Sequence, residues 1–127
     1  PGVICCGAHG ADDLRNYAKD RIKALGLHEG DETRKIRINS AGFRDDTFAA
    51  KAAGSKRLVV VGDSVVFGPG VTAEDRFMEQ LQARARQRAW PLELRSLGVN
   101  GYSFAHYLEL ARLDFLGLQP DGVLLPQ

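Results

Sequence analysis

The stretch "RLVVVGDSVVFGPG", residues 57–70, decides the fold of this 127-residue sequence. Residues 58–61 form a run of branched apolar side chains, which predicts a strand over residues 57–61 that is buried on both faces, as in a parallel sheet covered by helices. Gly-Asp-Ser ends this run abruptly, and Gly62 is expected to ease the turn that follows. A serine at the carboxyl end of such a strand lies where α/β proteins collect functional groups, so Ser64 is the first candidate site residue.

The residues that follow predict an alternation of helices and strands. We expect a helix over 72–89, a strand over 91–97, a helix over 103–117 and a strand over 122–125. Helices between consecutive strands indicate right-handed crossovers and a parallel sheet. The predicted fold class is therefore α/β, a three-layer α/β/α domain with a parallel sheet.

Both helices carry sequence signals at their ends. Thr72 and Asp75 stand in capping-box-like spacing at the start of the first helix. Its apolar face is predicted to consist of Phe77, Met78, Leu81 and Ala85. Ser103 is expected to cap the second helix, and Gly117 to end it.

The residues before position 57 do not show this alternation of strands and helices. Residues 12–26 predict a helix, residues 27–35 a polar connection, and "KIRIN", residues 35–39, a short strand that buries Ile36 and Ile38. Residues 40–56 are expected to form a long ordered loop. This divides the chain into an N-terminal helix and linker, residues 1–35, and a sheet domain, residues 36–127.

Composition excludes several classes of function. The sequence has 17 basic and 16 acidic residues, without a basic cluster, so nothing predicts a nucleic-acid partner. Its longest apolar run is far shorter than the roughly 20 residues of a membrane-spanning helix. Adjacent Cys5 and Cys6 are poor disulfide partners, and with His9 they fit no zinc spacing, so no metal is expected. The chain begins at Pro1, and its localisation stays open.

The loop over residues 62–70 allows two interpretations. Its serine suits a nucleophile, whereas its glycines would suit a cradle for a phosphate. The loop lacks the lysine of a P-loop and the glycine spacing of a dinucleotide site, so no cofactor is expected.

Four segments together resemble a known family. Gly-Asp-Ser with a glycine four residues after the serine, "INSAGFRDD" (38–46), "LGVNGYS" (97–103) and "PDGVLL" (120–125) are similar, in this order, to segments of the SGNH or GDSL hydrolases. The resemblance covers residues 36–125 and implies the flavodoxin-like fold of that family.

The resemblance implies roles for six residues. Ser64 would be the nucleophile that attacks an ester carbonyl, and the backbone N–H of Gly101 would donate to the oxyanion together with that of Ser64. Asp63 is expected to accept backbone hydrogen bonds in the loop rather than to act as an acid. The supporting residues are Gly62, Asp63, Gly68 and Asn100.

Other blocks of the family have no counterpart here. The sequence contains no Gly-x-Asn-Asp, which would add an oxyanion donor, and no Asp-x-x-His, which would supply the base. We therefore expect this sequence to be the N-terminal portion of such a domain, incomplete at its C-terminus and inactive or nearly so by itself. The expected substrate is a small-molecule or carbohydrate ester, and hydrolase and acyltransferase chemistry both stay open.

Several residues have two interpretations. His106 is either a replacement base or a packing residue, and Arg44 either contacts substrate or pairs on the surface with Asp45 or Asp46. The aromatic residues near Gly101 line either an acyl or sugar pocket or the core; they are Tyr102, Phe104 and Tyr107.

Two alternatives to an enzyme also follow from the sequence. One is a non-catalytic, flavodoxin-like module that binds an anion or nucleotide with the N–H groups of residues 62–70. The other is a degenerate domain retained for protein contacts.

Overall fold

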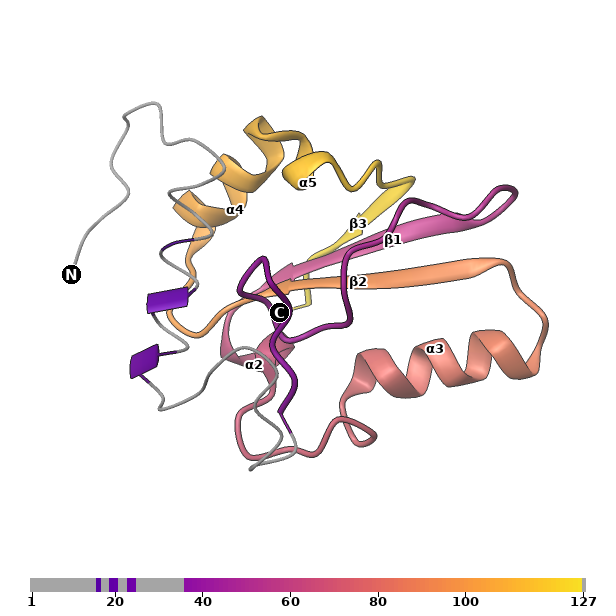
Figure 1. The fold of residues 1–127 in the computed structure, drawn as a ribbon, viewed down its shortest axis with the longest axis horizontal. Helices are drawn as coiled ribbons and strands as arrows, with labels where there is room; N and C mark the ends of the chain where they lie inside the picture. The colour runs from indigo at the N-terminus through magenta and orange to yellow at the C-terminus, as the bar shows by residue number, and fades with distance from the viewer. Residues whose placement is uncertain (1–15, 17–18, 21–22, 25–35, 127) are drawn as a thin grey trace.

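The computed structural model describes residues 16, 19–20, 23–24 and 36–126. In this part of the chain, three parallel strands form one sheet in the order β2–β1–β3. Helix α3 lies on one face of the sheet, and helices α4 and α5 lie on the other (Figure 1). The predicted α/β class with three layers and a parallel sheet is confirmed.

Strand β1, Lys56–Gly62, is the centre of the core. The side chains of Val59 and Val61 pack on one face of the sheet, in a cluster that includes Leu110 of α4. Val60 packs on the opposite face with Met78 of α3. All three valines are at most 1% exposed, which explains why the run is apolar without alternation.

Strand β2, Leu92–Gly98, pairs with β1 from Lys56↔Leu92 to Gly62↔Gly98, and β3, Gly122–Leu124, pairs with its other side. The three predicted strands are confirmed, and each of their ends differs from the predicted end by no more than one residue. Side chains satisfy the outer edge of β2, because the Leu94 N–H donates to Gln82 Oε1 (2.9 Å) and the Ser96 N–H to Asp45 Oδ2 (2.6 Å). These bonds occupy donors that would otherwise attract another strand.

Helix α3, Phe77–Gln87, begins five residues later than predicted. The Thr72 hydroxyl donates to the Asp75 carboxylate (2.9 Å), so these two side chains bond each other within a turn and do not cap the helix. Phe77 is 37% exposed, and its placement on the buried face was wrong. Met78 and Ala85 are buried as predicted, and Leu81 packs partly buried against the same cluster.

Helix α4, Phe104–Arg112, begins at the predicted Ser103 cap but ends earlier than predicted. Asp114, Phe115 and Leu116 have φ values of 50°, 47° and 60°, which interrupt the helix. These three residues belong to the short element α5, Asp114–Gly117, which therefore does not continue α4.

The predicted strand over residues 35–39 is wrong where the structure describes it. Ile36 and Ile38 are buried against Phe67, as their alternation indicated, but residues 36–39 pair with no strand of the described sheet. Asn39 begins a turn instead, since its Oδ1 accepts the Ala41 and Phe43 N–H groups (3.0 Å each). Beyond it, residues 47–55 form the predicted ordered connection, without helix or strand.

The predicted N-terminal helix over residues 12–26 lies mostly outside the described residues, as do Cys5, Cys6 and His9. The described residues of that segment are helical and exposed: Asn16, Lys19, Asp20, Lys23 and Ala24. The division at residue 35 stays a prediction. No helix within the described ranges has the length and apolar character needed to cross a membrane.

A buried ion pair joins the start of β1 to β2. Arg57, 2% exposed, donates to Glu93 Oε2 from Nε (3.1 Å) and Nη2 (2.7 Å) and to the carbonyl oxygens of Leu118 and Ala49 (3.0 and 2.9 Å). Burial acts to raise the pKa of Glu93, but hydrogen bonds from Ser55, Arg57 and a backbone N–H outweigh it and lower the pKa to about 2. Glu93 therefore stabilises the fold above pH 4.5, and this contribution is lost as the pH falls through about 2.

We predict that Glu93→Ala lowers the free energy of unfolding by about 3 kcal/mol at pH 7, because it leaves the buried Arg57 charge without its carboxylate. Urea denaturation followed by circular dichroism measures this loss. Asp46→Ala is the matched control, since the Arg37–Asp46 pair is exposed (62% and 73%) and its loss should cost less than about 1 kcal/mol. Equal losses in the two variants would contradict this account of the pair.

Candidate functional site

Ser64 is the first residue of a short helix that starts where β1 ends. This helix, α2, spans Ser64–Phe67, and the Asp63 side chain caps it by accepting the Val65 N–H (3.0 Å). Gly68, at φ 70°, ends the helix, and its N–H donates to the Ser64 carbonyl (2.8 Å). The residue Ser64 is exposed. A strand, a tight turn and one turn of helix thus present the serine at the edge of the sheet.

Two glycines let α2 approach this closely. Gly62 and Gly98 are partners in the register of β1 and β2, and a Cβ atom on either would overlap the Val66 side chain. The φ angle of Gly62 is not in the left-handed region, so the expectation that this glycine eases the turn was wrong. Its role is to leave space for α2 on the sheet.

The loop that follows β2, residues 99–103, lies at the same sheet edge as Ser64, because β1 and β2 are parallel and end together. The Val99 N–H donates to the Gly62 carbonyl (3.1 Å), and the Tyr102 N–H donates to the Val99 carbonyl (3.1 Å), which closes a turn. Gly101 lies in this turn at φ 87°, a conformation that favours glycine, with half-buried Asn100 before it. The hydrogen bonds among the described residues leave the N–H groups of Ser64 and Gly101 without an acceptor.

Helix α4 brings aromatic side chains to this edge. Burial raises the pKa of Tyr107, and the negative charge of Asp63 raises it further. Phe104, 68% exposed, contacts Tyr107 edge-on at 5.5 Å between ring centroids. Tyr102 is 4% exposed and belongs to the core cluster. The core interpretation thus holds for Tyr102 but not for Phe104.

His106 has a structural role. Its Nδ1 accepts the Ser103 N–H (3.0 Å) and lies 3.0 Å from the Ser103 hydroxyl oxygen, which forms a capping box at the start of α4. Its ring stacks on Tyr102 at 4.6 Å, and burial lowers its pKa. His106 is therefore the packing residue of the two interpretations. His9 and His28 lie outside the described residues.

Arg44 was placed wrongly by the surface interpretation. It is 1% exposed, and its guanidinium donates to the Phe67, Gly68 and Val71 carbonyl oxygens and not to Asp45 or Asp46. A side chain this buried is also not presented to a substrate. Arg76, 5% exposed, contacts the same region, and sequence reasoning missed it. Burial of an isolated arginine leaves no periodic signal that would have found it.

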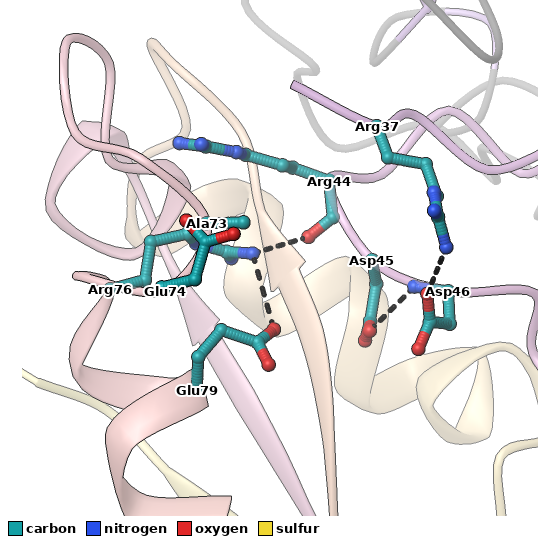
Figure 2. Close-up of a pocket in the computed structure, with 8 residues that line it drawn as sticks. All are labelled: Arg37, Arg44, Asp45, Asp46, Ala73, Glu74, Arg76 and Glu79. Atoms are coloured by element: carbon teal, nitrogen blue, oxygen red, sulfur yellow. Dashed lines mark hydrogen bonds and ion pairs between the residues drawn. The ribbon is translucent and has the colours of Figure 1, made fainter. Parts of the chain in front are cut away.

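A cavity of about 380 Å³ lies away from Ser64, between residues 37–46 and the start of α3 (Figure 2). Its lining mixes three arginines with four carboxylates: Arg37, Arg44, Asp45, Asp46, Ala73, Glu74, Arg76 and Glu79. Neither Ser64 nor Gly101 contributes to it, so this cavity is separate from the candidate site.

Asp45 is the unusual carboxylate of this cavity. Its Oδ2 accepts the Ser96 N–H of the β2 edge, and its Oδ1 accepts the Asp46 N–H (2.7 Å). Burial raises its pKa to about 6 in spite of these bonds. The Asp45 carboxyl group thus links the cavity wall to the sheet, and it binds its proton more tightly than a free aspartate does.

Within the described ranges, no three histidine, cysteine, aspartate or glutamate side chains are grouped so that they could hold a metal ion.

Comparison with known proteins gives little similarity. No family model matches the chain, and no curated protein is similar to it. A solved structure titled "Crystal Structure of TesA" is 26% identical over 55% of this chain and 39% of that chain, with a TM-score of 0.48. The matched part of this chain therefore spans well under half of that protein, and the fold and site rest on this chain's own geometry.

We predict that Asp45→Asn removes a pH dependence of stability. Because folding raises this pKa from 3.8 to about 6, the stabilisation from Asp45 is fully present below pH 4 and is lost as the pH rises through about 6. The variant should therefore gain up to about 3 kcal/mol over the wild type between pH 4 and pH 7. Urea denaturation at both pH values, with exposed Asp46→Asn as the matched variant, measures the gain; a difference that stays constant with pH would contradict it.

We also predict that Gly98→Ala destabilises the fold by about 1–3 kcal/mol, because its Cβ overlaps Val66. Adding Val66→Gly removes both overlapping atoms of Val66, Cγ1 and Cβ, so Gly98→Ala should cost less in that background. A double-mutant cycle from urea denaturation measures this coupling. Additive losses would show that Gly98 does not serve the packing of α2.

Proposed function

We propose that this protein is a serine-dependent hydrolase of ester bonds, with Ser64 as its nucleophile. The observation that carries the proposal is the exposed Ser64 at the start of α2, at the carboxyl end of the central strand and on the same sheet edge as the Gly101 turn. The resemblance of four segments to SGNH or GDSL hydrolases supports the same chemistry.

In the proposed reaction, the Ser64 Oγ attacks the ester carbonyl carbon and its proton passes to a base. The tetrahedral intermediate collapses, the C–O bond to the alcohol breaks, and the alcohol leaves with that proton. Water then attacks the acyl-enzyme, the carboxylic acid leaves, and the Ser64 hydroxyl is regenerated.

The N–H groups of Ser64 and Gly101 are the proposed oxyanion donors. Both belong to loops at one sheet edge, and neither bonds an acceptor among the described residues. Glycine at position 101 suits this role because the absence of a side chain lets an oxygen approach the amide. Loss of one such donor typically costs about 10²–10³ in rate.

The base of the reaction is not assigned to His106, because Nδ1 of this residue bonds Ser103 in the α4 cap. Asp63 is also not the base in this proposal, since its carboxylate caps α2. The activity is therefore proposed for the full-length protein, and its assay uses that protein.

The surroundings of Ser64 favour an uncharged, partly apolar substrate. Val65 is 61% exposed beside the serine, and Phe104 is 68% exposed on α4. Asp63 adds a negative charge near the same edge, which would repel an acidic ligand. A small-molecule or carbohydrate ester fits these surroundings.

The alternative of an anion-binding module has less support. The first turn of α2 would offer its N–H groups to an anion, but the Asp63 carboxylate already accepts the Val65 N–H (3.0 Å). A bound phosphate would have to displace this carboxylate or tolerate its charge. An anion-binding module would bind phosphate without hydrolysing an ester.

We predict that the full-length protein hydrolyses p-nitrophenyl acetate and that Ser64→Ala lowers kcat/KM by about 10³-fold or more. A fluorophosphonate should label the wild type once, at Ser64, as read by intact mass and peptide mapping. Exposed Ser40→Ala is the matched control and should keep both activity and labelling.

Hydrolysis that survives Ser64→Ala would overturn the proposal. Absence of turnover and labelling, together with phosphate binding that survives Ser64→Gly, would favour the anion-binding module instead.

A further inference from the structure

Helix α2 is too short to hold its own position. It has a single turn, and four residues form almost no internal hydrogen bonds, so a helix of this length is unstable unless other groups fix it. The carbonyl oxygens at its C-terminal end also lack partners within the helix. Whatever satisfies these carbonyls determines how α2, and with it Ser64, is oriented.

Arg44 supplies most of these partners from outside the helix. Its Nη1 donates to the Phe67 carbonyl (2.9 Å) and to the Gly68 carbonyl, and its Nη2 donates to the Val71 carbonyl (2.7 Å). The guanidinium carbon lies 5.7 Å from the centroid of the Phe67 ring. One planar side chain therefore holds the end of α2 and the turn after it.

Arg76 supplies the remaining contacts. Its Nη2 donates to the Val66 carbonyl (3.2 Å) and the Ser96 hydroxyl (3.3 Å), which connects α2 to β2. Its Nη1 donates to the backbone carbonyl of Arg44 (3.0 Å), as Figure 2 shows. Arg76 thus fixes the backbone from which Arg44 reaches α2.

The turn around Asn39 completes this arrangement. Asn39 Oδ1 accepts the Ala41 and Phe43 N–H groups, and its Nδ2 donates to the Asp46 carbonyl (3.1 Å). Phe43 is fully buried in the core cluster. The chain on both sides of Arg44 is therefore anchored, and the guanidinium is delivered in one orientation.

Stability alone does not call for arginine at position 44. Burial lowers the pKa of Arg44 to about 10, and the charge of Arg76 contributes, but the side chain stays charged at neutral pH. Among the described residues, its guanidinium donates to carbonyl oxygens and not to a carboxylate. Burying such charges is costly, and apolar residues are often at least as stabilising in their place. The gain from the arginine is the fixed geometry of α2.

We propose that Arg44 is a positioning residue that holds α2 in the orientation in which Ser64 reacts. The part of this inference that concerns reactivity rests on the proposed function, whereas the ordering of α2 by Arg44 does not. A small displacement of a nucleophile can lower the rate about 10²-fold, so the effect should be visible in both structure and turnover.

The test compares Arg44→Ala and Arg44→Lys in the full-length protein by hydrogen–deuterium exchange. The informative amides are those of Phe67, Gly68 and Val71, which bond carbonyls within α2 and its turn. We expect their exchange to rise about tenfold or more in Arg44→Ala, which corresponds to a loss of about 1.4 kcal/mol in local stability, while β1 amides keep their protection. Arg44→Lys keeps the charge but not the planar fork, so the exchange rates of these amides should lie between those of the wild type and those of Arg44→Ala. If Arg44→Ala does not fold, Arg44→Lys carries the test.

The kinetic arm uses the same variants with p-nitrophenyl acetate and a fluorophosphonate. Arg44→Ala should lower kcat and the rate of Ser64 labelling about 10²-fold with KM nearly unchanged, because the substrate contacts are intact while the nucleophile is misplaced. Arg37→Ala, an exposed arginine of the same segment, should change neither exchange nor kcat. Arg57→Ala, buried at the opposite end of β1, should lower global stability without a selective effect on α2.

Unchanged exchange in the three α2 amides, or a rise that is equal throughout β1, would overturn the positioning role. A change in exchange without a change in kcat or labelling of an active enzyme would overturn its link to Ser64. If the wild type neither turns over nor is labelled, the proposed function fails, and the exchange arm still decides whether Arg44 orders α2.

Discussion

The packing of Val66 onto Gly62 and Gly98 is the contact on which the rest of the structure depends. These glycines are paired neighbours at the ends of β1 and β2, and their missing side chains let α2 lie directly on the sheet. Since α2 starts two residues after the end of β1, Ser64 lies at the edge of the sheet. Close packing at one point therefore determines where the only chemistry proposed for this protein is found.

This geometry creates a problem that the segment before β1 solves. A one-turn helix pressed onto a sheet leaves buried carbonyl groups, and buried polar groups need partners. Arg44 and Arg76 provide them, and the Asn39 turn brings Arg44 into place. Two of the three buried arginines of the described residues, Arg44 and Arg76, thus bond the short helix that begins with Ser64.

Patterns of burial could be predicted from the sequence better than the limits of elements. The apolar run of β1 is long enough to specify a strand, because only a doubly covered strand tolerates it. Ile36 and Ile38 alternate as in a strand, yet their period reports only that one side is buried, here against Phe67. The non-helical residues 114–116 contain no glycine, so local propensity gave no warning that α4 ends before them.

The candidate site was also predictable only in part. Ser64 and Gly101 could be placed together because parallel strands end at one edge, whereas the partners that fix them come from distant positions that no motif connects. Arg44 holds the helix that carries Ser64, and His106 bonds Ser103 at the start of α4, directly after the turn that carries Gly101. A histidine three residues after a serine at a helix start completes a capping box, so the His106 imidazole fixes the start of α4 directly after the turn that carries Gly101.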